Sequence, residues 1–471
     1  MSRQIPICAL VLGTLLVISS NVMAATRTWT GTTSGTWSVA ANWGGTAPVA
    51  GDDLVFPSGP TTLITTNDFG AGTGFNSITF TGSGYTLNGN AIALGSQIVM
   101  NTTGTNTVNL AISLPGARTF SFIGVTNQVI IFNGIISGTG PLTVTGVAAG
   151  GDEVDLSGAN TYSGGTNLSD LFLRAGSSAA FGTGSVTVAS ISTTINGTNQ
   201  TIPNAMSLQG CGKGSNGVVN GDHATLSGPL TLTAATCLGG GGILTASGAI
   251  SGNFQLTAPQ NSIDDTVILS GSSPAFTNNL RVEAGTLRVN GSFPAATADF
   301  NNGTGNATLG GSGTIGGAVT IQSTNHLAPG NSPGILNTGN LNISSGSTYD
   351  VEIAGTTAGS GYDQTNVTGT VTLGGTLNVA MGFVPANGDQ FTIISNDGAD
   401  AVSGTFAGLA QGATFGASGN TLSISYTGGS GNDVVLTVVS SVPTLPRGLM
   451  WTLAVALLGV GALALRRRQL V

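Results

Sequence analysis

The stretch that decides the fold runs Leu156-Ser-Gly-Ala-Asn-Thr-Tyr-Ser-Gly-Gly-Thr166 and is followed by Phe181-Gly-Thr-Gly-Ser-Val-Thr-Val188. Glycine, serine and asparagine separate short runs in which apolar and polar residues alternate. Alternation with a period of two is typical of a β-strand, and it recurs along the chain, for example in Gly285-Thr-Leu-Arg-Val289. Because no window between Ala25 and Ser440 sustains a helical period, the sequence predicts an all-β fold.

A repeat of about 114 residues organises this region. Three segments recur at a spacing of 114 or 113 residues: Asn90–Leu94 as Asn204–Leu208, Gly134–Gly138 as Gly248–Gly252, and Leu156–Gly158 as Leu269–Gly271. If each repeat holds five coils, one coil has roughly 23 residues, which is within the usual range of solenoid repeats. Stacked coils would place apolar residues inside and short polar residues outside, so we expect a parallel β-helix over residues 75–440.

The same residues resemble a known family of repeats. Leu156–Thr166 and Phe181–Val188 resemble the autotransporter-associated β-strand repeat, also called the passenger-associated transport repeat. Leu309–Ile315 and Leu327–Leu336 are similar to the closing segments of such passengers. The resemblance covers most of residues 76–440. It implies a right-handed parallel β-helix that is exported, with a closing segment from about residue 309, and it implies architecture rather than a reaction.

The N-terminus is typical of a secretory signal peptide. Arg3 precedes an apolar run from about Ile7 to Ile18, and small residues follow up to Ala24. We therefore predict that residues 1–24 are a leader, cleaved between Ala24 and Ala25. The alternative is an uncleaved membrane anchor, for which the apolar run is short.

Residues 441–471 combine a short motif, an uncharged stretch and a cluster of arginines. The tail contains the motif Val442, Pro443, Thr444 and Leu445, the uncharged stretch Gly448–Leu465, and the cluster Arg466, Arg467 and Arg468. Eighteen helical residues would span roughly 27 Å, close to the hydrocarbon thickness of a bilayer. We therefore predict a single transmembrane helix whose Arg cluster stays cytoplasmic.

This arrangement resembles the PEP-CTERM class of tails, and the Val-Pro-Thr-Leu start is most similar to its IPTL-CTERM variety, in which isoleucine stands at the place of Val442. The resemblance implies a temporary tether in a Gram-negative inner membrane, removed by a sorting protease. The alternative is a permanent membrane anchor.

Charge limits the partners that the chain can take. Charged residues are 6% of the sequence, against about 25% in an average soluble domain. Between Ala25 and Ser440, six basic residues stand against 19 acidic ones, which leaves a net charge of −13. That balance argues against nucleic acid as a partner. We expect contact with inner-membrane export and sorting machinery, and with exopolysaccharide or surface glycans, and we expect no cofactor.

Two cysteines and three tryptophans stand out in the mature chain. Cys211 and Cys237 form a possible disulfide, because an exported chain enters an oxidising compartment; the alternative is a pair of free thiols. Trp29, Trp37 and Trp43 are the only tryptophans outside the tail. Because a solenoid needs a cap over its first coil, we interpret residues 25–74 as an N-terminal cap. The alternative is an aromatic platform on which a sugar stacks.

The acidic residues offer the main candidates for chemistry. They cluster as Asp52-Asp53, Asp152-Glu153-Asp155 and Asp264-Asp265. Asp152 and Asp265 lie 113 residues apart, at the same position of the repeat. Because an active site is normally built once, this recurrence favours a structural role in turns.

Histidine and glycine patterns give no stronger candidate. His223 and His326 are about a hundred residues apart, and no Cys/His spacing suits zinc. Gly428–Leu436 fits one copy of a calcium-binding β-roll nonapeptide, although a turn into the last strand is the simpler interpretation. The sequence therefore predicts no catalytic, cofactor or metal site.

Together these features predict an exported structural or adhesive protein of the cell surface or extracellular matrix, and not an enzyme. Two alternatives remain: a glycan-active lyase or hydrolase on the same fold, and a glycan-binding module that uses the Trp-rich N-terminal segment.

Overall fold

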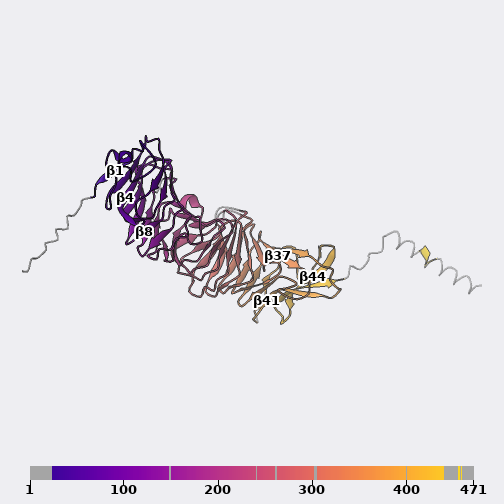
Figure 1. Cartoon of the computed structure of the whole chain (residues 1–471). Helices are drawn as coiled ribbons and strands as arrows, with labels where there is room; N and C mark the ends of the chain where they lie inside the picture. The colour runs from indigo at the N-terminus through magenta and orange to yellow at the C-terminus, as the bar shows by residue number, and fades with distance from the viewer. Residues whose placement is uncertain are drawn as a thin grey trace, which may run out of the picture. The chain divides into compact units, whose positions relative to one another are not determined.

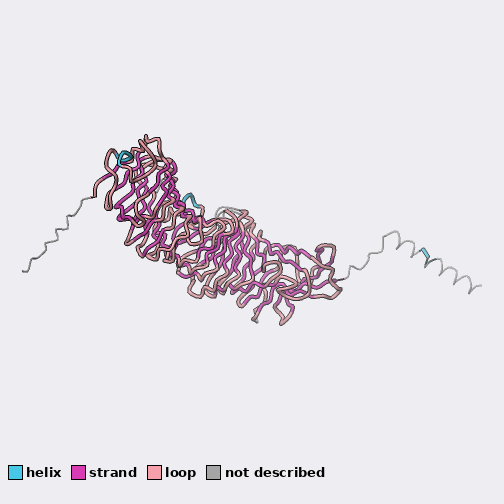
Figure 2. Tube along the Cα trace, in the orientation of Figure 1, coloured by secondary structure: helices cyan, strands magenta, loops and turns pink. Residues whose placement is uncertain are grey.

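The computed structural model describes residues 24–147, 150–239, 241–259, 263–301, 305–398 and 400–439, together with 455–456 and 458. The chain divides into two compact units, Met1–Thr193 and Thr194–Val471. Each is a solenoid of short parallel strands (Figures 1 and 2). The prediction of an all-β parallel β-helix is therefore confirmed.

The first unit contains two groups of parallel strands and the short 3-10 helix η1 (Ala40–Trp43). One group comprises β1 (Thr26–Thr28), β2 (Asp53–Pro57), β4 (Thr73–Thr81), β6 (Ile92–Met100), β8 (Ile112–Leu114), β9 (Arg118–Phe122), β11 (Ile136–Gly138), β12 (Leu142–Thr145), β14 (Thr166–Ser169) and β16 (Val186–Val188). The other comprises β3 (Ile64–Asn67), β5 (Thr86–Gly89), β7 (Gly104–Val108), β10 (Gln128–Phe132), β13 (Glu153–Leu156) and β15 (Phe172–Ala175).

The second unit begins with the pair β17 (Thr194–Asn196) and β20 (Val219–Asn220), with the 3-10 helix η2 (Lys213–Ser215). Its first long group comprises β19 (Met206–Gly210), β22 (Leu230–Cys237), β24 (Ile250–Ser251), β25 (Leu256–Thr257), β27 (Asn279–Val282), β30 (Thr297–Phe300), β33 (Val319–Ile321), β36 (Leu341–Ile343), β39 (Val371–Leu373) and β42 (Ser403–Gly404). Its second comprises β18 (Thr201–Ile202), β21 (Ala224–Leu226), β23 (Ile243–Ala246), β26 (Thr266–Leu269), β28 (Thr286–Val289), β31 (Thr308–Gly311), β34 (His326–Pro329), β37 (Thr348–Ile353) and β40 (Thr376–Met381).

A third group of the second unit changes direction at its end. It comprises β29 (Ser292–Phe293), β32 (Thr314–Ile315), β35 (Ile335–Thr338), β38 (Gln364–Val367) and β41 (Gln390–Asn396), followed by β45 (Asp433–Val439), β44 (Asn420–Gly428) and β43 (Thr414–Ala417). From β41 onward the pairings are antiparallel. These strands pair among themselves and end the stack of parallel coils in the described part of the unit.

The strand register explains the 114-residue repeat. In the first unit, Asp53 pairs with Ser77, Ser77 with Gln97, Gln97 with Thr119, Thr119 with Thr143, and Thr143 with Asn167. Five coils thus cover the 114 residues from Asp53 to Asn167. The predicted coil of roughly 23 residues is confirmed, because one coil is the distance along the chain that brings a strand back beside itself.

Alternation along each strand builds the core. In β28, Leu287 and Val289 are fully buried, whereas Thr286 and Arg288 lie on the outer side. Each such buried side chain contributes roughly 1.5–3 kcal/mol relative to an exposed one. The alternating pattern that predicted the strands therefore also places the apolar interior.

Glycines stack at one corner of the second unit. Each of these glycines follows a serine or an asparagine just after the end of a strand; they are Gly228, Gly248, Gly271, Gly291 and Gly313. A Cβ atom at Gly271 would lie 2.3 Å from the carbonyl oxygen of Gly248, and one at Gly291 would lie 2.0 Å from that of Gly271. Only glycine fits so close to the backbone of the preceding coil, and this is the physical basis of the recurring Leu-Ser-Gly motif.

Most residues of the predicted leader and of the predicted sorting tail lie outside the described residues. Residues 1–23 of the expected leader lie outside the described residues. So do Val442, Pro443, Thr444, Leu445 and the cluster Arg466, Arg467 and Arg468. Within the ranges given above, no helix combines the length and the apolar character that crossing a membrane requires.

Candidate functional site

The tryptophans of the N-terminal segment form the interior of the first coils. Trp29 and Trp37 are fully buried, and Trp43 is 5% exposed. Their rings are nearly perpendicular, at 78° for Trp29 against Trp43 and 89° for Trp37 against Trp43, and all three contact Phe56. Rings that are buried and crossed present no flat face to a sugar. The alternative of a Trp stacking platform is therefore wrong, because the rings are needed to fill the core.

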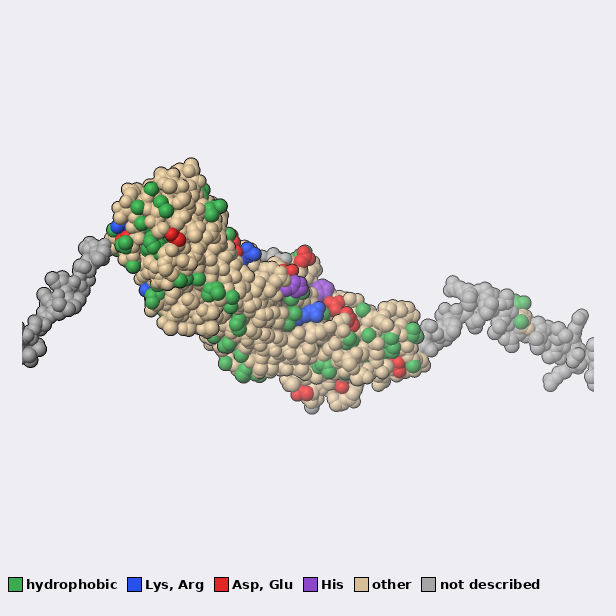
Figure 3. Space-filling model, viewed as in Figure 1, with side chains coloured by type: hydrophobic (Ala, Val, Ile, Leu, Met, Phe, Trp, Pro, Cys, Tyr) green, Lys and Arg blue, Asp and Glu red, His purple; other side chains and the backbone are tan. Residues whose placement is uncertain are grey.

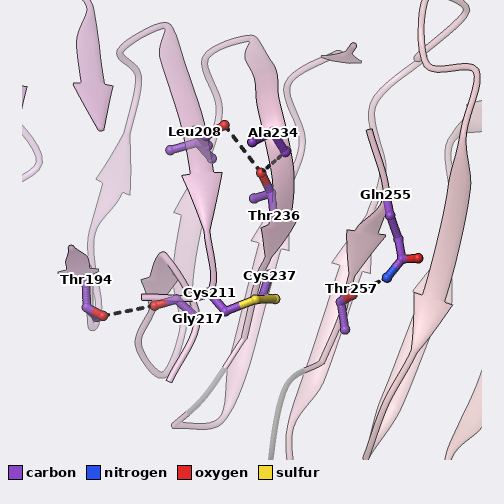
Figure 4. Close-up of a disulfide and its surroundings, with 9 residues drawn as sticks. All are labelled: Thr194, Leu208, Cys211, Gly217, Ala234, Thr236, Cys237, Gln255 and Thr257. Atoms are coloured by element: carbon purple, nitrogen blue, oxygen red, sulfur yellow. Dashed lines mark hydrogen bonds between the residues drawn. A yellow bond between two sulfur atoms is a disulfide. The ribbon is translucent and has the colours of Figure 1, made fainter. Parts of the chain in front are cut away.

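The structure joins Cys211 and Cys237 in a disulfide, with their Cα atoms 4.5 Å apart. Cys237 ends β22, and Cys211 directly follows β19, which pairs with β22 (Figure 4). The covalent bond thus links two neighbouring coils. Beside it, the hydroxyl of Thr236 donates to the backbone carbonyl of Ala234 at 2.9 Å.

Two of the acidic residues bind the backbone of the preceding coil. Asp152 is fully buried and accepts hydrogen bonds from the backbone N–H groups of Gln128 at 3.2 Å and Val147 at 2.9 Å. Asp265 accepts from the N–H of Gly242 at 2.8 Å. The structural role predicted from their shared position in the repeat is thus seen in both. These carboxylates satisfy buried amides where one coil turns over another.

Other candidate carboxylates are also held by the fold. Asp52 is 1% exposed and accepts from the N–H groups of Ala25 and Val49 and from Arg27 Nε at 2.8 Å. Burial opposes ionisation, but these hydrogen bonds outweigh it and lower the pKa of Asp52. Asp155 contacts Arg174 Nη1 at 3.0 Å.

The glycine-rich nonapeptide Gly428–Leu436 lies at the hairpin between β44 and β45, an antiparallel pair. Asp433, which would be its metal ligand, accepts a hydrogen bond from the N–H of Asn396 at 2.9 Å. Within the described residues, no group of three or more His, Cys, Asp or Glu side chains is placed to hold a metal ion.

The outer face of β28, β31, β34 and β37 carries a hollow of about 110 Å³ in the second unit. Arg288 pairs with Gly310, and Gly310 with Ala328. Leu327 pairs with Tyr349, so Ala328 lies beside Asp350 on the next strand. Two small residues therefore form a floor between Arg288 and Asp350, whose backbones are three strand spacings or about 14 Å apart. Figure 3 shows histidine, basic and acidic side chains gathered on one face of this unit.

The acidic wall of this hollow is held in place by its neighbours. Asp350 contacts His326 Nδ1 at 2.6 Å and accepts from Asn378 Nδ2 at 2.8 Å, so each of its oxygens has a partner. The hydroxyl of Ser332 donates to the carboxylate of Glu352. On the opposite side, Arg288 Nη1 donates one long hydrogen bond, 3.4 Å, to Asn331 Oδ1.

Asp363 also lines the hollow. It is 2% exposed, and its two oxygens accept from the backbone N–H groups of Gly334 at 2.8 Å and Glu352 at 2.9 Å. Burial raises the pKa of Asp363 to about 6, although these two hydrogen bonds act in the opposite direction. Because both oxygens serve the backbone, Asp363 positions the Gly330–Gly334 loop over the strands.

Sequence reasoning missed the residues of this hollow. His326 was noted only as an isolated histidine, and Asp350, Glu352 and Asp363 belong to none of the acidic clusters. They come together because successive coils bring residues about 22 positions apart onto neighbouring strands. One signal was present: Arg288, Asp350 and Glu352 occupy polar positions of the alternating runs Thr286–Val289 and Thr348–Ile353.

No family model matches the chain, and no curated protein matches it either.

Proposed function

We propose that the chain is an exported structural or adhesive protein of the cell surface or extracellular matrix, and that it has no enzymatic activity. The observation that carries this proposal is the outer surface of the coils, where short, uncharged polar side chains recur from one coil to the next. Along one edge of the first unit, Asn133 Nδ2 donates to Asn109 Oδ1 at 2.9 Å, and Asn109 Nδ2 donates to Asn88 Oδ1 at 2.8 Å. Such ladders suit broad, weak contacts with other surfaces rather than a single reaction centre.

Three features support export. The disulfide between Cys211 and Cys237 is of a kind that persists in oxidising compartments. The leader predicted in residues 1–24 and the tail predicted in residues 441–471 supply signals for secretion and sorting. The likeness to autotransporter-associated repeats adds a right-handed winding and an extracellular setting to the proposal.

The proposal is tested by cell fractionation of internally tagged protein, comparing the whole chain with a variant that lacks Pro443–Val471. We expect the whole chain at the surface or in the matrix, with a mature mass that excludes the leader and part of the tail. The truncated chain should lose surface retention. Equal surface amounts and equal mature masses for both chains would contradict the role of the tail, and a cytoplasmic, full-mass product would contradict export.

A glycan-active enzyme is the second candidate, and the hollow with Asp350 and Glu352 is the observation that favours it. Depolymerisation assays on neutral and acidic glycans, with the whole chain and with Glu352→Gln, separate the two candidates. We expect no release of reducing ends or unsaturated products from either chain. Release by the whole chain that Glu352→Gln abolishes would replace the structural proposal with the enzymatic one.

A further inference from the structure

We propose that the hollow over Gly310 and Ala328 is a binding site for a neutral saccharide. This inference rests on the proposed surface function and names the partner that one face of the second unit takes. The hollow differs from the Asn ladder because small residues interrupt a row of larger polar side chains. A ligand group can therefore enter the space between Arg288 and Asp350 instead of lying on a flat surface.

The polar groups on the two sides have opposite requirements. Arg288 has only donors, and within the described residues it forms no ion pair and just one long hydrogen bond. The carboxylates of Asp350 and Glu352 offer only acceptors. A hydroxyl group both donates and accepts, so a polyhydroxylated ligand can satisfy both sides at once. Three carboxyl groups line the hollow with one guanidinium, and this balance disfavours an anionic ligand.

The site is pre-formed. Asp350 is fixed by His326 and Asn378, and Asp363 fixes the loop that carries Ser332. Groups held in this way lose little conformational freedom when a ligand binds. The hollow is small, and none of the described residues that line it is aromatic. We therefore expect one sugar unit to enter it, with an affinity in the millimolar range that becomes effective when many copies contact one polysaccharide.

The test uses the whole chain and isothermal titration with four probes: maltotetraose, cellotetraose, mannotetraose and the anionic tetragalacturonate. Two variants remove the site in different ways: Arg288→Ala deletes the donor, and Ala328→Leu fills the hollow without changing its charge. Matched controls are Arg281→Ala, which removes an arginine paired with Asp299, and Thr231→Leu, which adds a leucine at an exposed position.

We expect at least one neutral probe to bind, with affinity lowered about tenfold or more by Arg288→Ala and by Ala328→Leu and unchanged in both controls. Absence of binding by all neutral probes, preference for tetragalacturonate, or undiminished binding by Ala328→Leu would overturn the inference. Surface localisation is measured separately, so a correctly localised chain that binds no saccharide refutes this site and leaves the proposed function intact.

A second observation concerns the first residue of the predicted mature chain. The backbone nitrogen of Ala25 lies 3.1 Å from Asp52 Oδ1, and Arg27 Nε lies 2.8 Å from Asp52 Oδ2. Ala24 is exposed, whereas Asp52 is buried. We infer that cleavage after Ala24 turns a neutral amide donor into an ammonium group that forms an ion pair with Asp52. Leader removal then fixes β1 against β2. This inference rests on the leader proposed above.

The ion pair is tested on chains that begin at Ala25 and at Ala24, each with and without Asp52→Asn. At pH 7 we expect the Ala25 chain to melt about 3 °C above the Ala24 chain, because a charge-assisted hydrogen bond is stronger than a neutral one. The ion pair raises the pKa of the amine above its ordinary value of about 8, so the difference should disappear above pH 10. It should also be absent in the Asp52→Asn pair.

Equal melting temperatures of the Ala25 and Ala24 chains at pH 7 would refute the ion pair. The mature N-terminus of exported protein, measured by mass spectrometry, tests leader cleavage itself. A different N-terminus would remove the biological setting of the inference, whereas the melting comparison decides the interaction.

Discussion

In the first unit, the coils begin around an aromatic cluster of Trp29, Trp37, Trp43 and Phe56, whereas the early coils of the second unit are joined by the disulfide between Cys211 and Cys237. Close glycine contacts between coils occur in both units, as at Gly158 against Gly134 in the first and Gly271 against Gly248 in the second. The first coils of a solenoid unit can thus be held together either by large side chains or by a covalent bond. Loss of the aromatic cluster should act on the first unit, and loss of the disulfide on the second.

The largest effect should come from the aromatic cluster. We expect Trp37→Ala to lower the free energy of unfolding of the first unit by about 3–5 kcal/mol, because it leaves a cavity in the core. Hydrogen exchange measured by mass spectrometry should show the loss in the first unit and not in the second. Trp37→Phe is the milder control, since Trp37 Nε1 is buried with no hydrogen-bond partner in the described residues. Equal losses in both units would contradict the comparison.

The disulfide should matter next. Cys211 and Cys237 are 26 residues apart, and a crosslink over a loop of this length stabilises by about 3 kcal/mol. Replacing both by serine, or reducing the bond, should speed exchange in β19 and β22 while leaving β1 to β6 unchanged. Unaltered exchange after complete reduction would show that the link is dispensable.

A methyl group at the glycine corner should have a smaller effect. Gly271→Ala should destabilise the second unit by about 1–3 kcal/mol, because its Cβ would overlap the carbonyl oxygen of Gly248. Gly70→Ala is the matched control: the position has no atom within 4 Å of the added carbon and should be neutral. Chemical denaturation of the two variants gives the comparison, and equal stabilities would rule out a steric role for the corner.

A pH dependence of the second unit is also expected, from Asp363. The folded chain holds the Asp363 proton more tightly than the unfolded chain, with a pKa of about 6 against 3.8. Its stabilising contribution is complete below pH 3.8 and is lost as the pH rises through 6, by about 2–3 kcal/mol. Denaturation between pH 4 and 7.5 should show this decline in the native chain and not in Asp363→Asn. An identical decline in the variant would assign it to other groups.

Strands, coil length and the roles of Asp152 and Asp265 could be predicted because they depend on local alternation and on a fixed spacing. The charged hollow could not. Arg288, Asp350 and Glu352 are separated by coils whose lengths vary, so a spacing rule cannot say which residues become neighbours. The burial of the tryptophans was also open, because an aromatic residue near a chain end suits a core or a surface equally well until its packing is known.

The sequence by itself determined the parallel β-solenoid, since apolar alternation, corner glycines and a regular repeat are each local and each points to the same structure. Only the tertiary structure decided that Trp29, Trp37 and Trp43 are core, that Cys211 lies against Cys237, and that Arg288 faces Asp350 across two small residues. These outcomes depend on the register between coils, and register is a property of stacked strands that no single stretch of the chain contains.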